Sequence, residues 1–286
     1  MVMSWGVVGV GLAGRARARA VLTDERCDLV GVVRGRFAHE FDVPSYRFEE
    51  LVAKADAVAV CSPNAFHAEQ VRVALGHNCH VLVEFPLALT SNEAAQLFRQ
   101  AESKRRLLHV EHIELLLAWH QALKGELRGD VDITMRMTKQ GTGNERPEQF
   151  FGACVARLHN LADLSPIVAL SAVAAQPGRL EIDLELESGQ ARLHIEAGPD
   201  FRRTTTMTVH DRNHSWRVQG HQLFCDDDQV QLPSSEASLF ARDHQHMMLR
   251  LLADKPPYVS SERVIDILRF SEQIAAMRSH EAEENS

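Results

Sequence analysis

Short apolar runs alternate with helix-compatible stretches over the first 113 residues. Buried strands are predicted at 3–9, 28–34, 57–61, 79–83 and 106–111. Helices are predicted between them at 12–22, 46–55, 67–77 and 92–105. Thr90 and Glu93 have the spacing of a capping box before the last helix. This alternation predicts an α/β domain over 1–113, a Rossmann fold with a doubly wound parallel sheet.

The periodicity changes after residue 113. Residues 114–128 and 149–164 have helical patterns, separated by a predicted loop at 140–148. Strands dominate from 167 to 232, where predicted hairpins pair 180–186 with 191–195 and 204–210 with 214–219. Helices return at 236–253 and 261–279. We therefore expect a second domain over 114–286, of α+β class with a large, mostly antiparallel sheet; its C-terminal helix can pack back on the first domain.

Composition excludes several classes of function. The chain has 286 residues, 45% of them hydrophobic, and a net charge of −8, which argues against a nucleic-acid-binding surface. It has no apolar run of 18 residues, and Met1 leads directly into the first predicted strand, so we expect neither a membrane span nor a secretory signal. Five scattered cysteines without a C-x-x-C pair suit a cytoplasmic protein with free thiols. No cluster has zinc-like spacing, since His244 and His246 point apart on a helix, and no metal is predicted.

The first predicted strand runs into a G-x-G-x-x-G turn formed by Gly9, Gly11 and Gly14. In a βαβ unit the first glycine allows a tight turn, the second lets the backbone approach a pyrophosphate, and the third lets the helix pack closely. Leu12 and Ala13 would then lie at the amide end of the helix, where the pyrophosphate binds. The alternative is that the glycines serve only the turn.

The end of the second predicted strand indicates which dinucleotide binds. NAD-binding domains hold the ribose 2′-hydroxyl with an acidic residue at this place, whereas this chain has Arg34, followed by Arg36. Guanidinium groups suit a 2′-phosphate, so NADPH is favoured and NADH remains possible. Alternatively, both arginines are solvated loop residues.

Three polar segments follow the later predicted strands, where side chains can orient a substrate or handle protons beside a nicotinamide. Their candidate residues are Ser62, Asn64 and His67; Glu84 and Phe85; and Glu111 and His112. Each also has an ordinary structural interpretation, as a helix start, a local cap or a satisfied pair.

Together, the glycine turn, the S-P-N-x-x-H segment and the E-x-P segment resemble the Gfo/Idh/MocA oxidoreductases, a resemblance that covers most of the chain. Sugar dehydrogenases of that family carry a lysine within E-x-P, and an Asp and a His four residues apart on the first helix of the second domain. Here these positions hold Phe85, Ala156 and Asn160, and the neighbouring His159 is turned away by about 100°. The base that an alcohol dehydrogenase needs is therefore missing.

The run Leu107-Leu-His-Val-Glu-His-Ile-Glu-Leu-Leu116 resembles the biliverdin reductase branch of that family, which also carries an aromatic residue after the Glu of E-x-P. There the aromatic residue is a tyrosine, whereas this chain has Phe85. Arg157 matches an arginine that faces the bilin, while a second arginine of some members would fall at Asn160. The resemblance implies hydride transfer from NADPH to the central methine bridge of biliverdin, giving bilirubin. It also favours a monomer over a homodimer.

The resemblance assigns roles to the candidate residues. The catalytic candidates are Arg157, Glu84 and His112; the cofactor-binding candidates are Gly9, Gly11, Leu12, Ala13, Arg34, Arg36, Ser62, Asn64, His67 and Glu84; the substrate-binding candidates are Phe85, Glu111, Arg157 and Asn160. Two other functions stay open: a dehydrogenase of another small carbonyl or sugar substrate, and a non-catalytic member that binds a nucleotide or a bilin.

Overall fold

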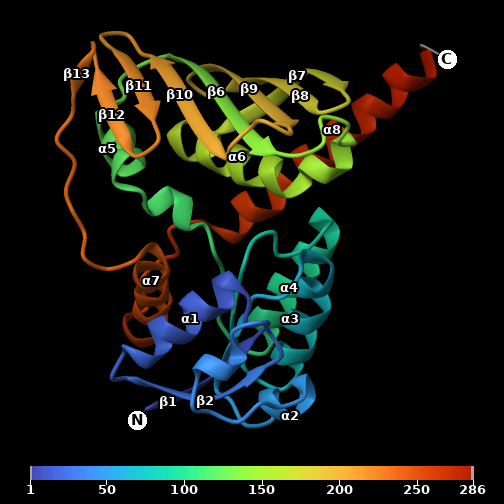
Figure 1. The fold of residues 1–286 in the computed structure, drawn as a ribbon, viewed down its shortest axis with the longest axis vertical. Coiled ribbons are helices and arrows are strands. Elements are labelled where there is room, and N and C mark those ends of the chain that lie inside the picture. Colours follow the sequence, from blue (N-terminus) through green and yellow to red (C-terminus); the bar gives the residue numbers. More distant parts are fainter. Residues whose placement is uncertain (1, 285–286) are drawn as a thin grey trace. The chain divides into compact units, whose positions relative to one another are not determined.

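The computed structural model describes residues 2–284, and side chains at all of these positions except 147, 148 and 277–284. The chain divides into two compact units (Figure 1). The first runs from the amino end to Ile113 and also includes Glu236–Asp266. The second comprises Glu114–Ser235 and the segment from Ile267 onward. Residues 236–266 are thus part of the first unit, although they follow the whole of the second sheet in sequence.

The first unit contains the five-stranded parallel sheet that the sequence predicts, in the order β2-β1-β3-β4-β5. Its strands are β1 (Met3–Val8), β2 (Cys27–Val33), β3 (Ala57–Val60), β4 (His80–Val83) and β5 (Leu108–Val110). All four residues of β3 are buried, as expected of a central strand covered on both faces. The Rossmann prediction is confirmed.

Helices cover both faces of this sheet. In Figure 1, α1 (Leu12–Leu22) lies beside α7 (Leu239–Ala253), and α3 (His67–Gly76) lies beside α4 (Ser91–Ser103) on the other side. The short α2 (Phe48–Val52) and the 3-10 turns η1 (Ala38–Glu40) and η2 (Asn64–Phe66) complete the connections. Thr90 caps α4 by accepting a hydrogen bond from the backbone N–H of Glu93, as its spacing predicts.

The second unit is built on an eight-stranded sheet in the order β13-β12-β11-β10-β6-β9-β8-β7. The strands are β6 (Val131–Gln140), β7 (Ile167–Gln176), β8 (Arg179–Leu186), β9 (Gly189–Gly198), β10 (Thr204–His210), β11 (Ser215–Gln219), β12 (Gln222–Cys225) and β13 (Asp228–Gln229). Both predicted hairpins are present, as β8–β9 and β10–β11. Within the described sheet, β6 and β9 are the one parallel pair, so the sheet is mostly antiparallel, as predicted.

Two parts of the sequence interpretation need correction. The predicted helix 114–128 is interrupted: a 3-10 turn η3 (Ile113–Leu116) precedes α5 (Ala118–Glu126), with Leu117 extended between them. Strand β6 was not predicted, although it lies between β10 and β9 in the sheet. Its signal is present, because Val131, Ile133, Met135 and Met137 are buried and alternate with exposed polar residues.

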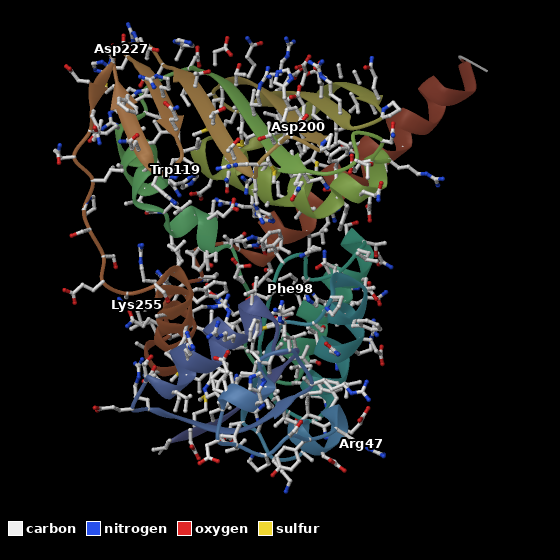
Figure 2. The ribbon with its side chains drawn as sticks, viewed as in Figure 1. Arg47, Phe98, Trp119, Asp200, Asp227 and Lys255 are labelled. Atoms are coloured by element: carbon white, nitrogen blue, oxygen red, sulfur yellow. The ribbon has the colours of Figure 1, made fainter. Side chains whose placement is uncertain are left out.

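One face of the large sheet is covered by α5, α6 (Phe151–Leu164, preceded by the 3-10 turn η4, Pro147–Phe150) and part of α8 (Ser261–Glu284) (Figure 1). The other face is polar. Figure 2 shows the buried Trp119 of α5 below the sheet and the exposed Asp227 at an outer turn. Among the described residues, no helix combines the length and apolar character that a membrane crossing requires.

Candidate functional site

The glycine turn between β1 and α1 has the geometry of a dinucleotide-binding loop. Gly9 has φ of +85°, and a Cβ there would lie 2.8 Å from the backbone nitrogen of Ser62. A Cβ on Gly14 would lie 2.2 Å from the carbonyl oxygen of Gly9, so the helix packs directly against the turn. A Cβ on Gly11 would meet nothing within 4 Å. That open side is where a pyrophosphate approaches the backbone.

The amide end of α1 faces this opening without a competing group. Gly11 is its N-cap residue and provides no side-chain cap, and the first turn holds no acidic residue. The N–H groups of Leu12 and Ala13 at the start of the helix therefore carry the uncompensated positive end of the helix dipole. This arrangement suits a phosphate anion.

Two exposed arginines follow the end of β2. Arg34 has φ of +30° and accepts a hydrogen bond from the N–H of Val10, which fixes this corner beside the glycine turn. The guanidinium of Arg36 lies 5.3 Å from the centre of the Phe37 ring, and that of Arg15 lies 4.8 Å from the same ring. Arg15 is paired with Glu40, whereas neither Arg34 nor Arg36 has a carboxylate partner among the described side chains. Both are available to an anionic ligand.

His67 joins two of the predicted segments. It is buried, its Nδ1 lies 2.9 Å from the carbonyl oxygen of Pro86, and its Nε2 lies 2.7 Å from that of Ser62. The ring therefore connects the S-P-N-x-x-H loop to the E-x-P loop. In this arrangement its contacts are to the backbone, while Ser62 bonds Gln70 through its hydroxyl and Asn64 is exposed.

Glu84 is held by a buried arginine that the sequence analysis did not select. Arg17 of α1 donates from Nε to Oε1 of Glu84 over 2.7 Å and from Nη1 to Asp243 of α7 over 2.6 Å. Burial alone would lower the pKa of Arg17, but Glu84 and Asp243 raise it above its ordinary value. Arg17 therefore carries a permanent charge that fixes the direction of the Glu84 carboxylate.

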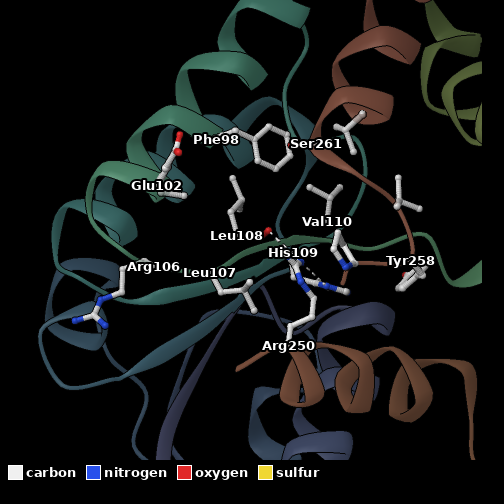
Figure 3. A pocket seen from close by; sticks show the side chains of 14 residues that line it. Phe98, Glu102, Arg106, Leu107, Leu108, His109, Val110, Arg250, Tyr258 and Ser261 are labelled. Carbon is white, nitrogen blue, oxygen red and sulfur yellow. Dashed lines mark hydrogen bonds between the residues drawn. The ribbon is translucent and has the colours of Figure 1, made fainter. Parts of the chain in front are cut away.

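Asp243 is in turn bonded by His109 of β5, over 2.8 Å, and by the hydroxyl of Tyr258, over 2.5 Å. Burial would raise the pKa of Asp243, yet His109 and Arg17 lower it below the ordinary range. Figure 3 shows the outer side of this network, where His109, Arg250 and Tyr258 line a cavity of about 200 Å³. Arg250 donates to Nδ1 of His109 over 3.3 Å.

Glu111 is a buried carboxyl group close to this network. Its Oε1 accepts a hydrogen bond from the N–H of Ile113 over 2.6 Å, while its Oε2 is buried without a partner. Burial and the charge of Glu84 raise the pKa of Glu111 well above its ordinary value, against the opposing effect of Arg17. The raised pKa favours the protonated form of Glu111, which is able to donate a hydrogen bond.

Phe85 and His112 form a flat pair next to these carboxyl groups. Their rings are stacked, with centroids 6.0 Å apart and planes inclined by 22°. The backbone N–H of His112 donates to the Tyr258 hydroxyl, which fixes the loop after β5. Phe85 occupies the position that a lysine holds in the sugar dehydrogenases that the sequence resembles, so this position offers an aromatic surface instead of a proton acceptor.

In the second unit, Arg157 of α6 is 2% exposed and reaches the covered face of the sheet, where it donates to the hydroxyl of Thr205 over 2.7 Å. It also forms an ion pair with Glu114, which accepts from Asn160 over 3.3 Å and lies 3.6 Å from Arg203. Burial and, to a smaller extent, the charge of Arg203 lower the pKa of Arg157 to about 10, so the guanidinium is still charged at neutral pH.

Several residues of these clusters were not predicted from the sequence, among them Glu114, Arg17 and Asp243. Glu114 lies in the quoted ten-residue run, so that run was the signal that could have identified it. Arg17 and Asp243 are 226 residues apart, and no local pattern connects them. Their only sequence signal is a charged residue on the otherwise apolar face of a predicted helix.

The chain matches known proteins in both sequence and fold. Residues 3–112 match the profile described as "Oxidoreductase family, NAD-binding Rossmann fold" (GFO_IDH_MocA). Among curated proteins, the chain is 29% identical to biliverdin reductase A of Mus musculus over 73% of this chain and 76% of that protein. It is 26% identical to biliverdin reductase A of Homo sapiens over 94% of this chain and 93% of that protein.

Among solved structures, the fold is similar to that of the biliverdin reductase from Synechocystis sp. PCC 6803, crystallised in complex with biliverdin and NADP+. The TM-score is 0.83, the sequence identity is 24%, and the match covers 96% of this chain and 98% of that one. At this identity the likeness establishes the fold of the whole chain.

Proposed function

We propose that the chain is a biliverdin reductase within the Gfo/Idh/MocA family of NAD(P)-dependent oxidoreductases, whose profile matches residues 3–112. The reaction would be reduction of the central methine bridge (C10) of biliverdin by NADPH, giving bilirubin. The observation that carries the proposal is similarity to human biliverdin reductase A over nearly the whole chain. The run Leu107–Leu116 supports it, because the resemblance to that branch is concentrated there.

The missing proton acceptors agree with this chemistry. Phe85, Ala156 and Asn160 occupy the positions at which sugar dehydrogenases of the family carry a lysine, an aspartate and a histidine. A conjugated tetrapyrrole has no hydroxyl proton to remove, so its reduction needs a positioned hydride and a proton for a pyrrole nitrogen. A site that lacks these three groups is consistent with a bilin substrate, and it lacks the base that polyol dehydrogenases of the family use.

The cofactor-binding roles follow from the geometry of the first unit. The amides of Leu12 and Ala13 would bind the pyrophosphate, and Arg34 and Arg36 would bind the 2′-phosphate. Glu84 is fixed by Arg17 and would hold the nicotinamide end. Bound NADPH supplies the hydride. These assignments make NADPH the preferred cofactor and NADH a weaker one.

The substrate roles are divided between flat and charged groups. The stacked Phe85 and His112 rings would support the plane of the bilin. Glu111, whose raised pKa favours the protonated form, would donate a proton or a hydrogen bond to the tetrapyrrole. Arg157 is charged at neutral pH and is a poor acid, so it would bind a propionate or orient a pyrrole nitrogen in exchange for its contact with Glu114.

The first test is the visible spectrum of the purified protein mixed with biliverdin and NADPH, with NADH in a parallel sample. Conversion of the green pigment to a yellow product supports the proposal. A shifted biliverdin spectrum without conversion indicates a binding protein, and no spectral change contradicts the bilin assignment. In that last case, NADP+ reduction with sugars and polyols tests for a dehydrogenase of another substrate.

Arg157→Gln tests the proposed substrate contact. Loss of a charge-assisted contact is expected to reduce kcat/KM by about 10- to 100-fold. Arg192→Gln is the matched control, because Arg192 is exposed on the polar face of the same sheet and pairs with Asp183. An Arg157→Gln protein with normal kcat/KM but lower stability would show that Arg157 is only structural. We also propose that the enzyme is a monomer, which sedimentation at several concentrations tests.

A further inference from the structure

Asp24, Cys27 and His244 bring an oxygen, a sulfur and a nitrogen donor together on the first unit. Asp24 lies in the turn after α1, Cys27 begins β2, and His244 lies on α7. The three donor atoms lie within 4.8 Å of one another. Since β2 has seven residues, Cys27 is about 20 Å from the Arg34 end of the strand. The cluster is therefore separate from the proposed cofactor site.

The distances within the cluster match those of a metal site. Nε2 of His244 lies 3.6 Å from Sγ of Cys27 and 3.2 Å from Oδ2 of Asp24. In a tetrahedral zinc site with Zn–S of about 2.3 Å and Zn–N and Zn–O of about 2.0 Å, the sulfur and nitrogen are about 3.5 Å apart and the nitrogen and oxygen about 3.3 Å apart. The two distances from His244 therefore match a tetrahedral site, and the sulfur of Cys27 and the carboxylate of Asp24 lie within 4.8 Å of each other, where a shared zinc ion needs about 3.5 Å.

The surroundings provide a second, independent indication of a ligand. The indole N–H of Trp5 is completely buried and has no hydrogen-bond partner among the described residues. It lies beside the sulfur of Cys27. Burial and the charge of Asp24 raise the pKa of the Cys27 thiol to about 11, so a metal ion would have to displace its proton on binding. The indole N–H is then placed to donate to the metal-bound sulfur. Trp5 also packs edge-on against the His244 ring, with centroids 5.1 Å apart, and so fixes its orientation.

The cluster is accessible to a metal ion. Asp24 and His244 line an open pocket of about 290 Å³, together with Thr23 and Glu25. Solvent can therefore provide the fourth ligand, as in zinc sites with three protein ligands. His244 itself is 3% exposed, so His244 and Asp24 belong to the pocket wall and not to a freely solvated surface, and the half-buried Cys27 lies beside them.

We propose that Asp24, Cys27 and His244 form a zinc site that ties α7 to the turn between α1 and β2. The mixed oxygen, sulfur and nitrogen donor set suits zinc better than calcium or magnesium, which prefer oxygen alone. No metal site was predicted from the sequence, because Cys27 and His244 are 217 residues apart and no closely spaced set of ligands points to them. The site joins elements that only the fold brings together.

The positive charge of Arg26 competes with a zinc ion for the carboxylate of Asp24. It donates to both carboxylate oxygens of Asp24, over 2.8 and 2.7 Å, and its side chain is 44% exposed. Zinc would share Oδ2 of Asp24 with this arginine or displace it towards solvent. Arg26→Gln is therefore expected to bind zinc more tightly than the wild-type protein, whereas Asp24→Asn is expected to bind it more weakly.

The test uses the full chain, stripped with a chelator and titrated with Zn²⁺ and, in parallel, with Co²⁺. We expect one equivalent to bind and a sulfur-to-cobalt charge-transfer band in the near ultraviolet. Zinc at about 100 times its dissociation constant should raise the Tm by about 5–10 °C. Cys27→Ser should abolish the band and weaken zinc binding at least 100-fold, while leaving dinucleotide binding unchanged.

Cys225→Ser is the matched control, because Cys225 belongs to a second, exposed cluster with His214 and Asp226. This variant should keep both the stoichiometry and the band. Loss of the band in Cys225→Ser but not in Cys27→Ser, or the absence of a stoichiometric metal in the wild-type protein, would overturn the proposal. If Cys27→Ser fails to fold, the opposite effects of Arg26→Gln and Asp24→Asn decide, and equal affinities in both variants would also overturn it.

Discussion

The buried charge network around Arg17 predicts a large stability loss for Asp243→Asn. Asp243 is completely buried and accepts hydrogen bonds from Arg17, His109 and Tyr258. Asparagine keeps the shape and one acceptor oxygen but removes the negative charge. Arg17 would then have only Glu84, whose side chain is 15% exposed, as an anionic partner.

Breaking one partner of a buried ion pair costs about 3–5 kcal/mol. Three hydrogen bonds to a charged group, each worth about 1.5–3 kcal/mol, set an upper range of about 5–9 kcal/mol, of which the amide retains a part. We therefore expect the free energy of unfolding of the first unit to fall by about 3–5 kcal/mol. With a urea m-value of about 2 kcal/mol per molar, the midpoint should fall by about 2 M.

The assay is hydrogen exchange of peptides from α1 and α7 at increasing urea concentrations, which follows the first unit separately from the second. Asp42→Asn is the control, because Asp42 is an exposed carboxylate of the same unit, and its effect should stay within about 0.5 kcal/mol. A loss below about 1 kcal/mol for Asp243→Asn, or an equal loss for Asp42→Asn, would refute the reasoning.

The pH dependence of this difference has a defined sign. The pKa of Asp243 is lowered in the folded protein, so its charge contributes stability above the unfolded value of about 3.9. That contribution is lost as the pH falls through the folded pKa. The wild-type protein and the variant should therefore differ fully at pH 7, begin to converge below about pH 4 and continue to do so as the pH falls to the folded pKa.

Three further predictions concern the candidate site. The pKa of Glu111 is raised in the folded protein, so its contribution to stability is lost as the pH rises above about 4.3. In chemical denaturation, Glu111→Gln should therefore show a gain in the free energy of unfolding over wild type that grows from pH 5 to pH 8. A difference that stays constant with pH would contradict the assignment. Arg34→Ala and Arg36→Ala should each raise the Kd of NADPH about 10- to 100-fold and leave that of NADH nearly unchanged, as measured by nicotinamide fluorescence; equal losses for both cofactors would exclude a 2′-phosphate contact. Gly11→Ala should have the Tm of the wild-type protein but a weaker affinity for the dinucleotide. Gly14→Ala should lower the Tm, because its Cβ would lie 2.2 Å from the Gly9 carbonyl oxygen. The reverse pattern would place the phosphate elsewhere.

The order of elements was predictable wherever the periodicity was strong. The parallel strands of the first unit are short and mostly buried, and the β8–β9 hairpin alternates cleanly around its turn. The break at Leu117 was not predictable, because the helical pattern of 114–128 continues across it. Strand β6 was missed despite its alternating pattern, since it follows a predicted helix and precedes a predicted loop.

The features of the candidate site were likewise predictable from the sequence only in part. The glycine turn was predictable because each glycine has a local backbone reason. The contacts of His67, Glu84 and Arg157 were not, because the Pro86 carbonyl, Arg17 and Glu114 are brought to them only by the fold. Sequence spacing located these side chains, but it could not identify the partners that set their charge and direction.

The return of residues 236–266 to the first unit has a consequence for synthesis on the ribosome. When the first 113 residues have emerged, Arg17 lacks Asp243, and the side of the sheet that α7 covers is exposed. The nascent domain must remain in this incomplete state until more than 120 further residues have been translated. We expect that a fragment ending at Ile113 cannot complete its core, and that ribosome-bound chains gain protease resistance in this domain only after α7 has left the exit tunnel.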